Sequence, residues 1–252
     1  MKTIISHFYN EEYLLPWWLN HHKKYFDDGI MINYASTDNS VNIIKEICPN
    51  WTIINSKNQT FSAAEVDQEV MEIESNIKGW KIALNTTEFL VGKYSILTDI
   101  QPREIYVPCF YFVDDQEFRN SIDKELPLFN QLFYGLDVSN TSYSRGSRAL
   151  HNHIISYSPG RHFRNAHNTN EFIIFNYGFS PMTKEFYERK LQIQNRIPDS
   201  DKSRGLGGEH TNNGMGLTKD SLLSLYNSFL PKIKNLKEEM DHFITLMECD
   251  NA

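Results

Sequence analysis

The chain has 252 residues, of which 40% are hydrophobic and 23% are charged, a composition typical of a folded globular protein that excludes intrinsic disorder. A chain of this length buries enough surface to need neither a disulfide nor a metal for its core, and we expect one domain. Its net charge of −7 argues against nucleic acid as a partner, because proteins that bind the phosphate backbone are normally basic.

The cysteines and the apolar runs bear on the cellular compartment. Cys48, Cys109 and Cys249 lie far apart and form no C-x-x-C pair, which favours reduced thiols over a disulfide framework or a zinc site. No apolar run approaches the roughly 18–20 residues that span a bilayer. The chain reaches Asn10 and two glutamates too soon for the apolar core of a signal peptide. We expect a cytoplasmic protein without a transmembrane segment.

Short apolar segments alternate with amphipathic segments in the first part of the chain. This β-α-β-α-β order predicts a parallel sheet with right-handed crossovers. We expect Gly29 and Gly79 to end the first and third helices, and Asp38 or Ser40 to cap the second. The predicted strands are 3–8, 30–34, 51–55 and 80–85, and the predicted helices are 11–26, 41–47 and 63–76.

The remainder of the chain is less regular. Two further strands are predicted at 104–112 and 171–177, and helices at 182–194 and 219–249, the last interrupted by Pro231. Residues 198–213 form a polar, glycine-rich segment, which predicts a loop.

Three polar clusters follow predicted strands, at residues 6–11, 33–38 and 85–89. In open α/β sheets, ligands bind beyond the carboxyl ends of the strands. Any one cluster is explained by turn and capping chemistry alone. Three clusters at successive strand ends predict a ligand-binding edge.

The motifs in these clusters resemble those of a known family. Residues 9–11 (Tyr-Asn-Glu) precede Leu14–Trp18 and the pair His21-His22, residues 36–40 read Ser-Thr-Asp-Asn-Ser, and residues 80–91 read Trp-Lys-Ile-Ala-Leu-Asn-Thr-Thr-Glu-Phe-Leu-Val. In order and spacing they resemble glycosyltransferase family 2-like proteins of the GT-A fold, including the branch related to family 92. The resemblance covers roughly residues 3–92 and, more loosely, 157–210.

The resemblance implies a fold and an activity. The fold would be α/β, with a Rossmann-like, mainly parallel mixed sheet flanked by helices and a C-terminal helical segment. One glycosyltransferase domain would comprise a nucleotide-sugar half (1–92), an acceptor and catalytic half (93–215) and C-terminal helices (216–252). It would move a sugar from a nucleotide-sugar donor to a hydroxyl acceptor with inversion, and the aromatic content of 13% favours a glycan acceptor.

The resemblance also assigns donor-binding roles. Residues 9–11 would border the base and ribose, and Asn33 stands where the family's second motif has its first aspartate. Asp38 would brace that turn or reach the nucleotide. Capping without ligand contact is the alternative. The full expected donor set is His7, Tyr9, Asn10, Glu11, Asn33, Asp38, Asn85, Thr87, Arg161, His162 and Arg204.

The sequence departs from the family at the metal site. The family's Asp-x-Asp binds Mn²⁺ or Mg²⁺, but Asn85 and Thr87 occupy those positions and only Glu88 is nearby. Hard divalent cations prefer anionic oxygen ligands. Asn176 also stands where relatives often carry histidine. We therefore expect no metal ligand and no resident cofactor, with weak Mn²⁺ or Mg²⁺ binding at most.

Without a metal, cationic side chains must stabilise the leaving diphosphate. Arg161 and His162 lie in a short basic loop (160–163), and Lys202 and Arg204 lie in the glycine-rich segment. The alternative is a solvated basic surface. The wider basic cluster comprises Arg145, Arg148, His151, His153, Arg161, His162, Arg164 and His167.

An inverting transferase also needs a base for the acceptor hydroxyl. Glu209 is the first candidate, followed by Asp201 and His210, on a segment whose glycines would let it close over substrate. Glu88 is a further candidate because it directly follows the donor motif.

Two other functions compete with this interpretation. The missing Asp-x-Asp is compatible with a catalytically silent GT-A domain that binds a glycan or a partner. The histidines around His151 and His153 are compatible with a metal-dependent hydrolase, although no zinc signature is present.

Overall fold

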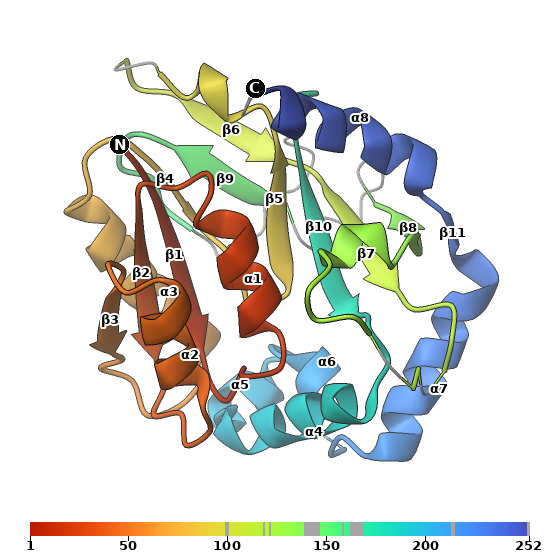
Figure 1. Ribbon diagram of the computed structural model, residues 1–252. Coiled ribbons are helices and arrows are strands. Elements are labelled where there is room, and N and C mark those ends of the chain that lie inside the picture. The colour runs from red at the N-terminus through yellow and green to blue at the C-terminus, as the bar shows by residue number, and fades with distance from the viewer. Residues whose placement is uncertain are drawn as a thin grey trace.

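A computed structural model describes residues 1–98, 101–117, 119–120, 122–138, 147–157, 159–161, 169–212 and 215–250, with the backbone alone at 208–209. Two mixed sheets lie next to one another, flanked by helices (Figure 1). A long C-terminal helix packs against the second sheet. The predicted α/β fold with a mainly parallel N-terminal sheet and a C-terminal helical segment is confirmed.

The first sheet contains the predicted parallel unit. Its first four strands are parallel, and the last two run antiparallel to their neighbours. The carboxyl ends of the parallel strands therefore meet at one edge, at the bottom of Figure 1. In spatial order the strands are β3 (Thr52–Asn55), β2 (Asp28–Asn33), β1 (Lys2–Phe8), β4 (Trp80–Ala83), β9 (Arg148–His151) and β6 (Glu104–Val107).

The second sheet is joined to the first by a tight connection. Residues 84–87 lead from β4 directly into β5, which pairs antiparallel with β10, so the third polar cluster lies at the junction of the two sheets. In spatial order its strands are β11 (Lys234–Asn235), β8 (Tyr134–Asp137), β7 (Cys109–Val113), β10 (Phe172–Phe179) and β5 (Glu88–Gly92).

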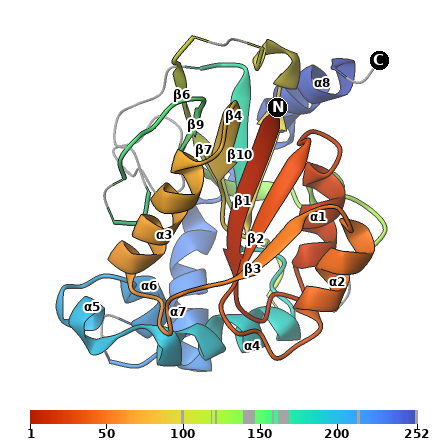
Figure 2. The ribbon, with the colours of Figure 1, turned by 90° about the vertical axis from the view of Figure 1, so that its left-hand side faces the viewer.

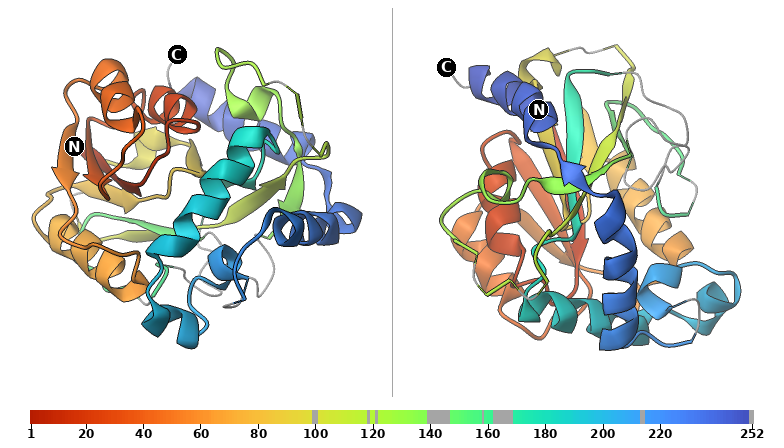
Figure 3. Two further views of the ribbon diagram at one scale, coloured as in Figure 1. Left: turned by 90° about the horizontal axis from the view of Figure 1, so that it is seen from below. Right: turned by 90° about the vertical axis from the view of Figure 1, so that its right-hand side faces the viewer.

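The helices cover both faces of the first sheet and its lower edge. The first two helices cover one face and the third covers the other (Figure 2). Helices α4 to α6 lie beneath the strand ends, and α4 runs across the gap between the sheets (Figure 3). The helices are α1 (Leu15–His22), α2 (Ser40–Ile47), α3 (Ala63–Ser75), α4 (Lys184–Ile193), α5 (Asp199–Ser203), α6 (Gly208–Thr211), α7 (Lys219–Phe229) and α8 (Lys237–Cys249), with 3₁₀ turns η1 (Tyr94–Ile96), η2 (Leu128–Asn130), η3 (Gln194–Arg196) and η4 (Leu230–Lys232).

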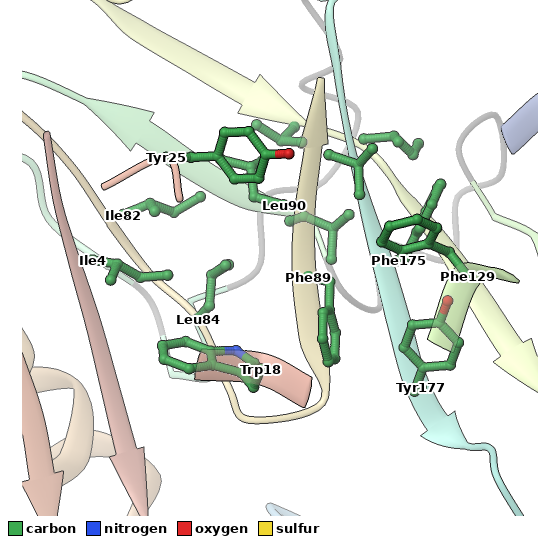
Figure 4. Packing of buried hydrophobic residues seen from close by; sticks show 14 of the residues in the cluster. Ile4, Trp18, Tyr25, Ile82, Leu84, Phe89, Leu90, Phe129, Phe175 and Tyr177 are labelled. Atoms are coloured by element: carbon green, nitrogen blue, oxygen red, sulfur yellow. The ribbon is translucent and has the colours of Figure 1, made fainter. Parts of the chain in front are cut away.

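The alternation of side chains along the strands explains this layering. Ile4 faces the α1 side and Ile5 faces α3, as successive strand residues must. Trp18 of α1 lies against Leu84 and Phe89 at the junction (Figure 4). Its indole nitrogen donates to the Glu88 carbonyl at 2.9 Å, so the core itself fixes the start of β5.

Several predicted elements differ from the observed ones. Gly29 does not end a helix but lies inside β2, where a Cβ would meet the Trp51 ring at 2.2 Å. The predicted strand 104–112 is two strands in different sheets, separated at Pro108, which cannot donate a ladder hydrogen bond.

The ends of the chain also show differences. The predicted helix 11–26 is shorter, because turns surround α1. The predicted loop 198–213 contains α5 and α6, and the predicted helix 219–249 is two helices with the short strand β11 between them. In the described part of the chain, no helix is both long and apolar enough to cross a membrane.

Candidate functional site

The first two polar clusters meet at the carboxyl ends of β1 and β2. The backbone N–H of Asn10 donates to Ser36 Oγ at 3.1 Å, and Asn10 Oδ1 accepts from the N–H of Thr37 at 2.7 Å. Asn33 Oδ1 accepts from the Ser36 N–H at 2.9 Å. The predicted convergence of these clusters at one edge is therefore present.

Several predicted donor residues act within these turns. Asp38 accepts from the N–H groups of Glu12 and Ser40, each at 3.0 Å, so it braces the turn. Glu11 is buried and forms an ion pair with Arg189 of α4. Asn10 is also tied to α4, because its amide donates to Gln192 at 3.1 Å. Contact of these residues with a nucleotide remains a prediction.

Unusual backbone conformations gather at the same edge. Asn10, Ala35 and Arg161 have φ values of 50°, 57° and 54°. Among the described non-glycine residues, only Asn212 shares this conformation, with φ of 49° beside α6. Such conformations are costly and concentrate at functional sites.

An aromatic group lies beside β1 and β2. Tyr34 and Phe61 stack with ring centroids 4.7 Å apart, and Tyr9 contacts Phe61 edge-on at 5.9 Å. The Arg196 guanidinium lies 4.4 Å from the Tyr9 ring centroid and donates to the Tyr34 carbonyl at 2.7 Å. We call Tyr9, Tyr34, Phe61 and Arg196 the aromatic group. Flat rings and guanidinium planes of this kind suit a nucleobase.

His7 connects this group to a buried set of ion pairs. Its ring centroid lies 6.0 Å from that of Tyr34 and 6.3 Å from that of Phe61. Burial, together with the charges of Arg161 and Arg148, holds the pKa of His7 well below its usual value. His7 is therefore a neutral imidazole between the aromatic group and the two arginines.

The third polar cluster is held by a pair of buried ions. Arg148 binds both carboxylate oxygens of Glu88, at 2.7 and 3.0 Å, and donates to the Gly160 carbonyl at 2.8 Å. Glu88 also accepts from the Asn85 N–H at 2.8 Å. Because its two oxygens are occupied and Glu88 is 0% exposed, it is an anchor in this state rather than an available base.

A second ion pair lies directly beside Asn85. Asp67 of α3 pairs with the Arg161 guanidinium and also accepts from the Gly160 N–H at 2.7 Å. Arg161 in turn donates to Asn85 Oδ1 at 3.2 Å. A guanidinium thus contacts the side chain that stands at the first Asp-x-Asp position. Thr87 is buried next to it and contributes its carbonyl to the Tyr177 N–H at 2.8 Å.

Two arginines at this edge have unsatisfied donors. The Nε atoms of Arg161 and Arg196 are buried and have no hydrogen-bond partner among the residues that the structure describes. Buried donors in native proteins are nearly always paired, so each orphan calls for an explanation. An oxyanion in contact with either guanidinium would satisfy the Nε donor of that arginine.

The candidate bases occupy different surroundings. Asp201 accepts from the Ala63 N–H at 2.7 Å, so it caps α3 across a separation of 138 residues. His210 has a shielded Nδ1 without a partner, and burial with the charges of Lys190 and Arg189 lowers its pKa to about 3. The Glu209 side chain lies outside the described residues, as does His162, and Arg204 is exposed.

The histidine cluster forms no metal centre in the described residues, where no group of three or more metal-ligating side chains converges. His151 lies 3.4 Å from Glu74 Oε1 and 3.2 Å from the Tyr157 hydroxyl. His153 contacts the Arg103 carbonyl at 3.3 Å. His162 and His167 lie outside the described residues, so the hydrolase hypothesis stays a prediction.

Sequence reasoning missed Asp67, Arg196 and Lys190, and treated Arg148 as one member of a basic cluster. Asp67 and Arg161 are 94 residues apart, and no local pattern marks such a pair. Lys190 had a weak signal, because it follows Phe186 by four residues on the face of α4 that packs inward.

A cavity of about 430 Å³ opens beside the loop that follows Tyr177. Its lining includes Tyr13, whose hydroxyl lies 2.9 Å from Thr183 Oγ1 at the start of α4. Lys124 and Asn120 also line it. This cavity lies next to part of the region where the sequence predicts that the acceptor enters.

No protein-family model and no curated protein matches this chain. Among solved structures, it is similar to residues 1–349 of S. aureus TarS, with 11% identity, a TM-score of 0.42, and coverage of 89% of this chain and 74% of that chain. For the same fragment in complex with UDP-GlcNAc the identity is 12% and the TM-score is 0.41, with coverage of 97% of this chain and 79% of that chain.

A further similarity is to glucosyl-3-phosphoglycerate synthase from Mycobacterium tuberculosis, solved with Mn²⁺, UDP and glucosyl-3-phosphoglycerate. It has 11% identity and a TM-score of 0.33, over 44% of each chain. At these values the similarity concerns the course of the backbone alone. No sequence family matches, so the GT-A resemblance inferred from the motifs stays a prediction.

Proposed function

We propose that this protein is a glycosyltransferase that uses a nucleoside-diphosphate sugar without a divalent cation. The observation that carries the proposal is that two arginines at this edge, Arg161 and Arg196, have buried Nε donors without a hydrogen-bond partner among the described residues. Arg196 belongs to the aromatic group, and the charge of Arg161 helps to lower the pKa of His7. The donor would lie across the carboxyl ends of β1, β2 and β4.

In this proposal the two arginines supply the positive charge that a divalent cation would supply in a metal-dependent glycosyltransferase. A diphosphate leaving group needs positive charge aimed at its oxygens, and a guanidinium fork suits that geometry. Arg161 is already paired with Asp67, so its pair carries little net charge. Arg196 has no carboxylate partner among the described residues and therefore provides the net positive charge.

Asn85 supports the absence of a metal from the mechanism. An aspartate at position 85 would place a second carboxylate beside Asp67 and favour a cation between them. The neutral amide instead accepts a hydrogen bond from Arg161 at 3.2 Å. The proposed role of Asn85 is to orient that guanidinium toward the diphosphate.

The nucleobase would bind at the aromatic group. The Tyr9 ring is half-buried, and Arg196 lies over it. A base entering here would gain stacking on these groups, which is worth about 1–3 kcal/mol for a base on an aromatic side chain. Asn33 and Asp38 would shape this end of the site by holding the loop.

For the acceptor half we propose Glu209 as the base, since Glu88 and Asp201 are engaged in structural hydrogen bonds. The acceptor hydroxyl would approach between Glu88, the loop after Tyr177 and residues 205–210. Inversion belongs to this proposal through the family resemblance. NMR of the product is the direct check: retention of the donor's anomeric configuration would overturn it.

The proposal is tested by turnover. Purified protein is incubated in EDTA with UDP-, GDP-, TDP- and CMP-sugars and candidate glycan acceptors, and the released nucleotide is measured. We expect one donor class to react at similar rates in EDTA and in Mn²⁺. Arg196→Met should lower kcat/KM for that donor at least about tenfold. The control Lys45→Met, which removes an exposed cation of α2, should change it less than about twofold.

A silent binding domain is the second candidate, and one observation favours it. Of the four predicted bases, Glu88 and Asp201 have their carboxylates engaged, and burial with nearby cations lowers the pKa of His210 to about 3. This candidate predicts nucleotide or glycan binding without turnover for any donor. Loss of activity in Glu209→Gln, with nucleotide affinity unchanged, would rule it out.

A further inference from the structure

Lys190 is a buried lysine with no counter-ion in contact. It is 5% exposed and lies on the inner face of α4, with its ammonium 4.8 Å from the Phe179 ring centroid and 5.9 Å from that of Phe186. Among the described residues, no carboxylate comes within salt-bridge distance and no acceptor within hydrogen-bond distance of its Nζ. Burying a charge without such partners is costly.

The charged residues around Lys190 do not compensate for the cost of burying its ammonium. The neighbouring carboxylate, Glu11, is held by Arg189. Burial, reinforced by the charge of Arg189 and only partly opposed by Glu11, lowers the pKa of Lys190 to about 7. The lysine is therefore placed where one additional negative charge would be strongly favoured.

A second unsatisfied group lies nearby. His210 belongs to α6, which packs against α4, and within the described residues its shielded Nδ1 has no hydrogen-bond partner. Burial lowers the pKa of His210, and the charge of Lys190 on the adjacent helix α4 lowers it further. The positive φ of Asn212, 49°, lies in the same segment.

We propose that Lys190 and His210 form a binding site for a phosphate group carried by the acceptor substrate. Lys190 would supply the charge, and His210, in its Nδ1-protonated tautomer, a directed hydrogen bond. The site lies between α4 and α6, beside the segment 205–210 that borders the proposed acceptor path. Its assignment to the acceptor rests on the proposed function; its binding of an oxyanion does not.

Phosphate is favoured over a purely apolar occupant by the charge of Lys190, which has no salt-bridge partner among the described residues, and by the unsatisfied Nδ1 of His210. A phosphate monoester presents several acceptor oxygens and about −1.5 to −2 charge at neutral pH. It can therefore neutralise Lys190 and accept from His210 at once. Filling the site would stabilise the protein by mass action.

The first test uses inorganic phosphate as the probe. Its binding is measured by calorimetry and by NMR of ¹³C-lysine-labelled protein. We expect the Lys190 ε-methylene signal to titrate near pH 7 and its midpoint to rise by about one pH unit or more when phosphate is added. A titration unchanged by phosphate would overturn the proposal, and this readout needs no variant to fold.

Variants then locate the binding. Lys190→Met and His210→Phe should each weaken phosphate binding at least about tenfold. Lys184→Met is the matched control, because Lys184 is an exposed lysine of the same helix; it should leave binding unchanged. Equal phosphate affinity in all three variants would contradict the assignment.

A competition experiment separates the acceptor site from the donor site. Phosphate and the nucleoside diphosphate should bind together, and Lys190→Met should not change nucleotide affinity. Competition between them would assign the lysine to the donor diphosphate and overturn the acceptor assignment. If phosphate binds but no nucleotide does, the proposed function fails while the oxyanion site stands.

Discussion

Two buried cations near the lower edge of the sheets have opposite surroundings. Arg148 is 2% exposed and binds both oxygens of Glu88 and the Gly160 carbonyl. Lys190 is 5% exposed, its ammonium lies 4.8 Å from the Phe179 ring centroid, and it has no salt-bridge partner within the described part of the chain. The charge of Arg148 is neutralised by Glu88 within the fold. The charge of Lys190 has no such partner among the described residues, and a bound anion would neutralise it. Pairing, more than burial or charge, separates a structural cation from a candidate binding cation.

The largest expected effect comes from breaking the paired cation. Arg148→Met leaves Glu88 buried without its partner and should destabilise the fold by about 3–5 kcal/mol in urea unfolding. The double variant with Glu88→Gln should recover part of that loss, because it removes the uncompensated charge. A single-variant loss below about 1 kcal/mol would mean that Arg148 is not an anchor.

Removing the unpaired cation, Lys190, should stabilise the protein, whereas removing Arg148 should destabilise it. Between pH 7 and the usual lysine pKa of 10.5, the unfolded chain holds a proton that the folded Lys190 does not, so the free energy of unfolding rises with pH. Below pH 7 both states are protonated and the full penalty remains. Lys190→Met should therefore be more stable than wild type at pH 6.5, on the order of a few kcal/mol.

Lys190→Met should also make the free energy of unfolding less dependent on pH. Urea unfolding at pH 6.5 and 9 measures both quantities, and Lys184→Met serves as the control. A Lys190→Met protein that is less stable than wild type at both pH values would show that the lysine is satisfied in the native state.

The aromatic group gives a smaller and more specific effect. Arg196→Met should reduce nucleotide affinity by about tenfold or more, equivalent to about 1.4 kcal/mol. Little change in stability is expected, since Arg196 has no carboxylate partner in the described residues. Calorimetric titration and urea unfolding separate the two effects. Equal affinity in variant and wild type would remove Arg196 from the donor site.

The smallest expected effect belongs to Asp201. Because its carboxylate caps α3 at the Ala63 N–H, Asp201→Ala should cost about 0.5–2 kcal/mol of stability. Turnover should fall less than about twofold once the protein is folded. A hundredfold loss of kcat with normal stability would restore Asp201 as a candidate base.

The sequence predicted the N-terminal sheet well because its periodicity is local. The apolar runs around Ile4, Ile32 and Ile54 each mark one strand, and α3 follows from Val66 and Val70 on one face. Local patterns could not show that the segment around Pro108 divides between two sheets. They also misassigned Gly29, whose role depends on the Trp51 ring packed against it.

The positions of the candidate residues at the strand ends were predicted, but the pairing of their charges was not. Asn10, Asn33 and Asn85 do lie at successive strand ends, as their positions after apolar runs imply. Which cations are neutralised depends on contacts between distant segments, such as Asp67 with Arg161 across 94 residues. Such contacts form only in the folded chain, so the difference between Arg148 and Lys190 could not be predicted.

The most direct test of the account is calorimetric binding of UDP, GDP, TDP and CMP, each measured in EDTA and again in Mn²⁺. The account predicts that one nucleotide binds with similar affinity in both, and that Arg161→Gln and Arg196→Met weaken that binding in EDTA. Binding that appears only with Mn²⁺ would contradict it, because a metal would then do the work assigned here to the two arginines.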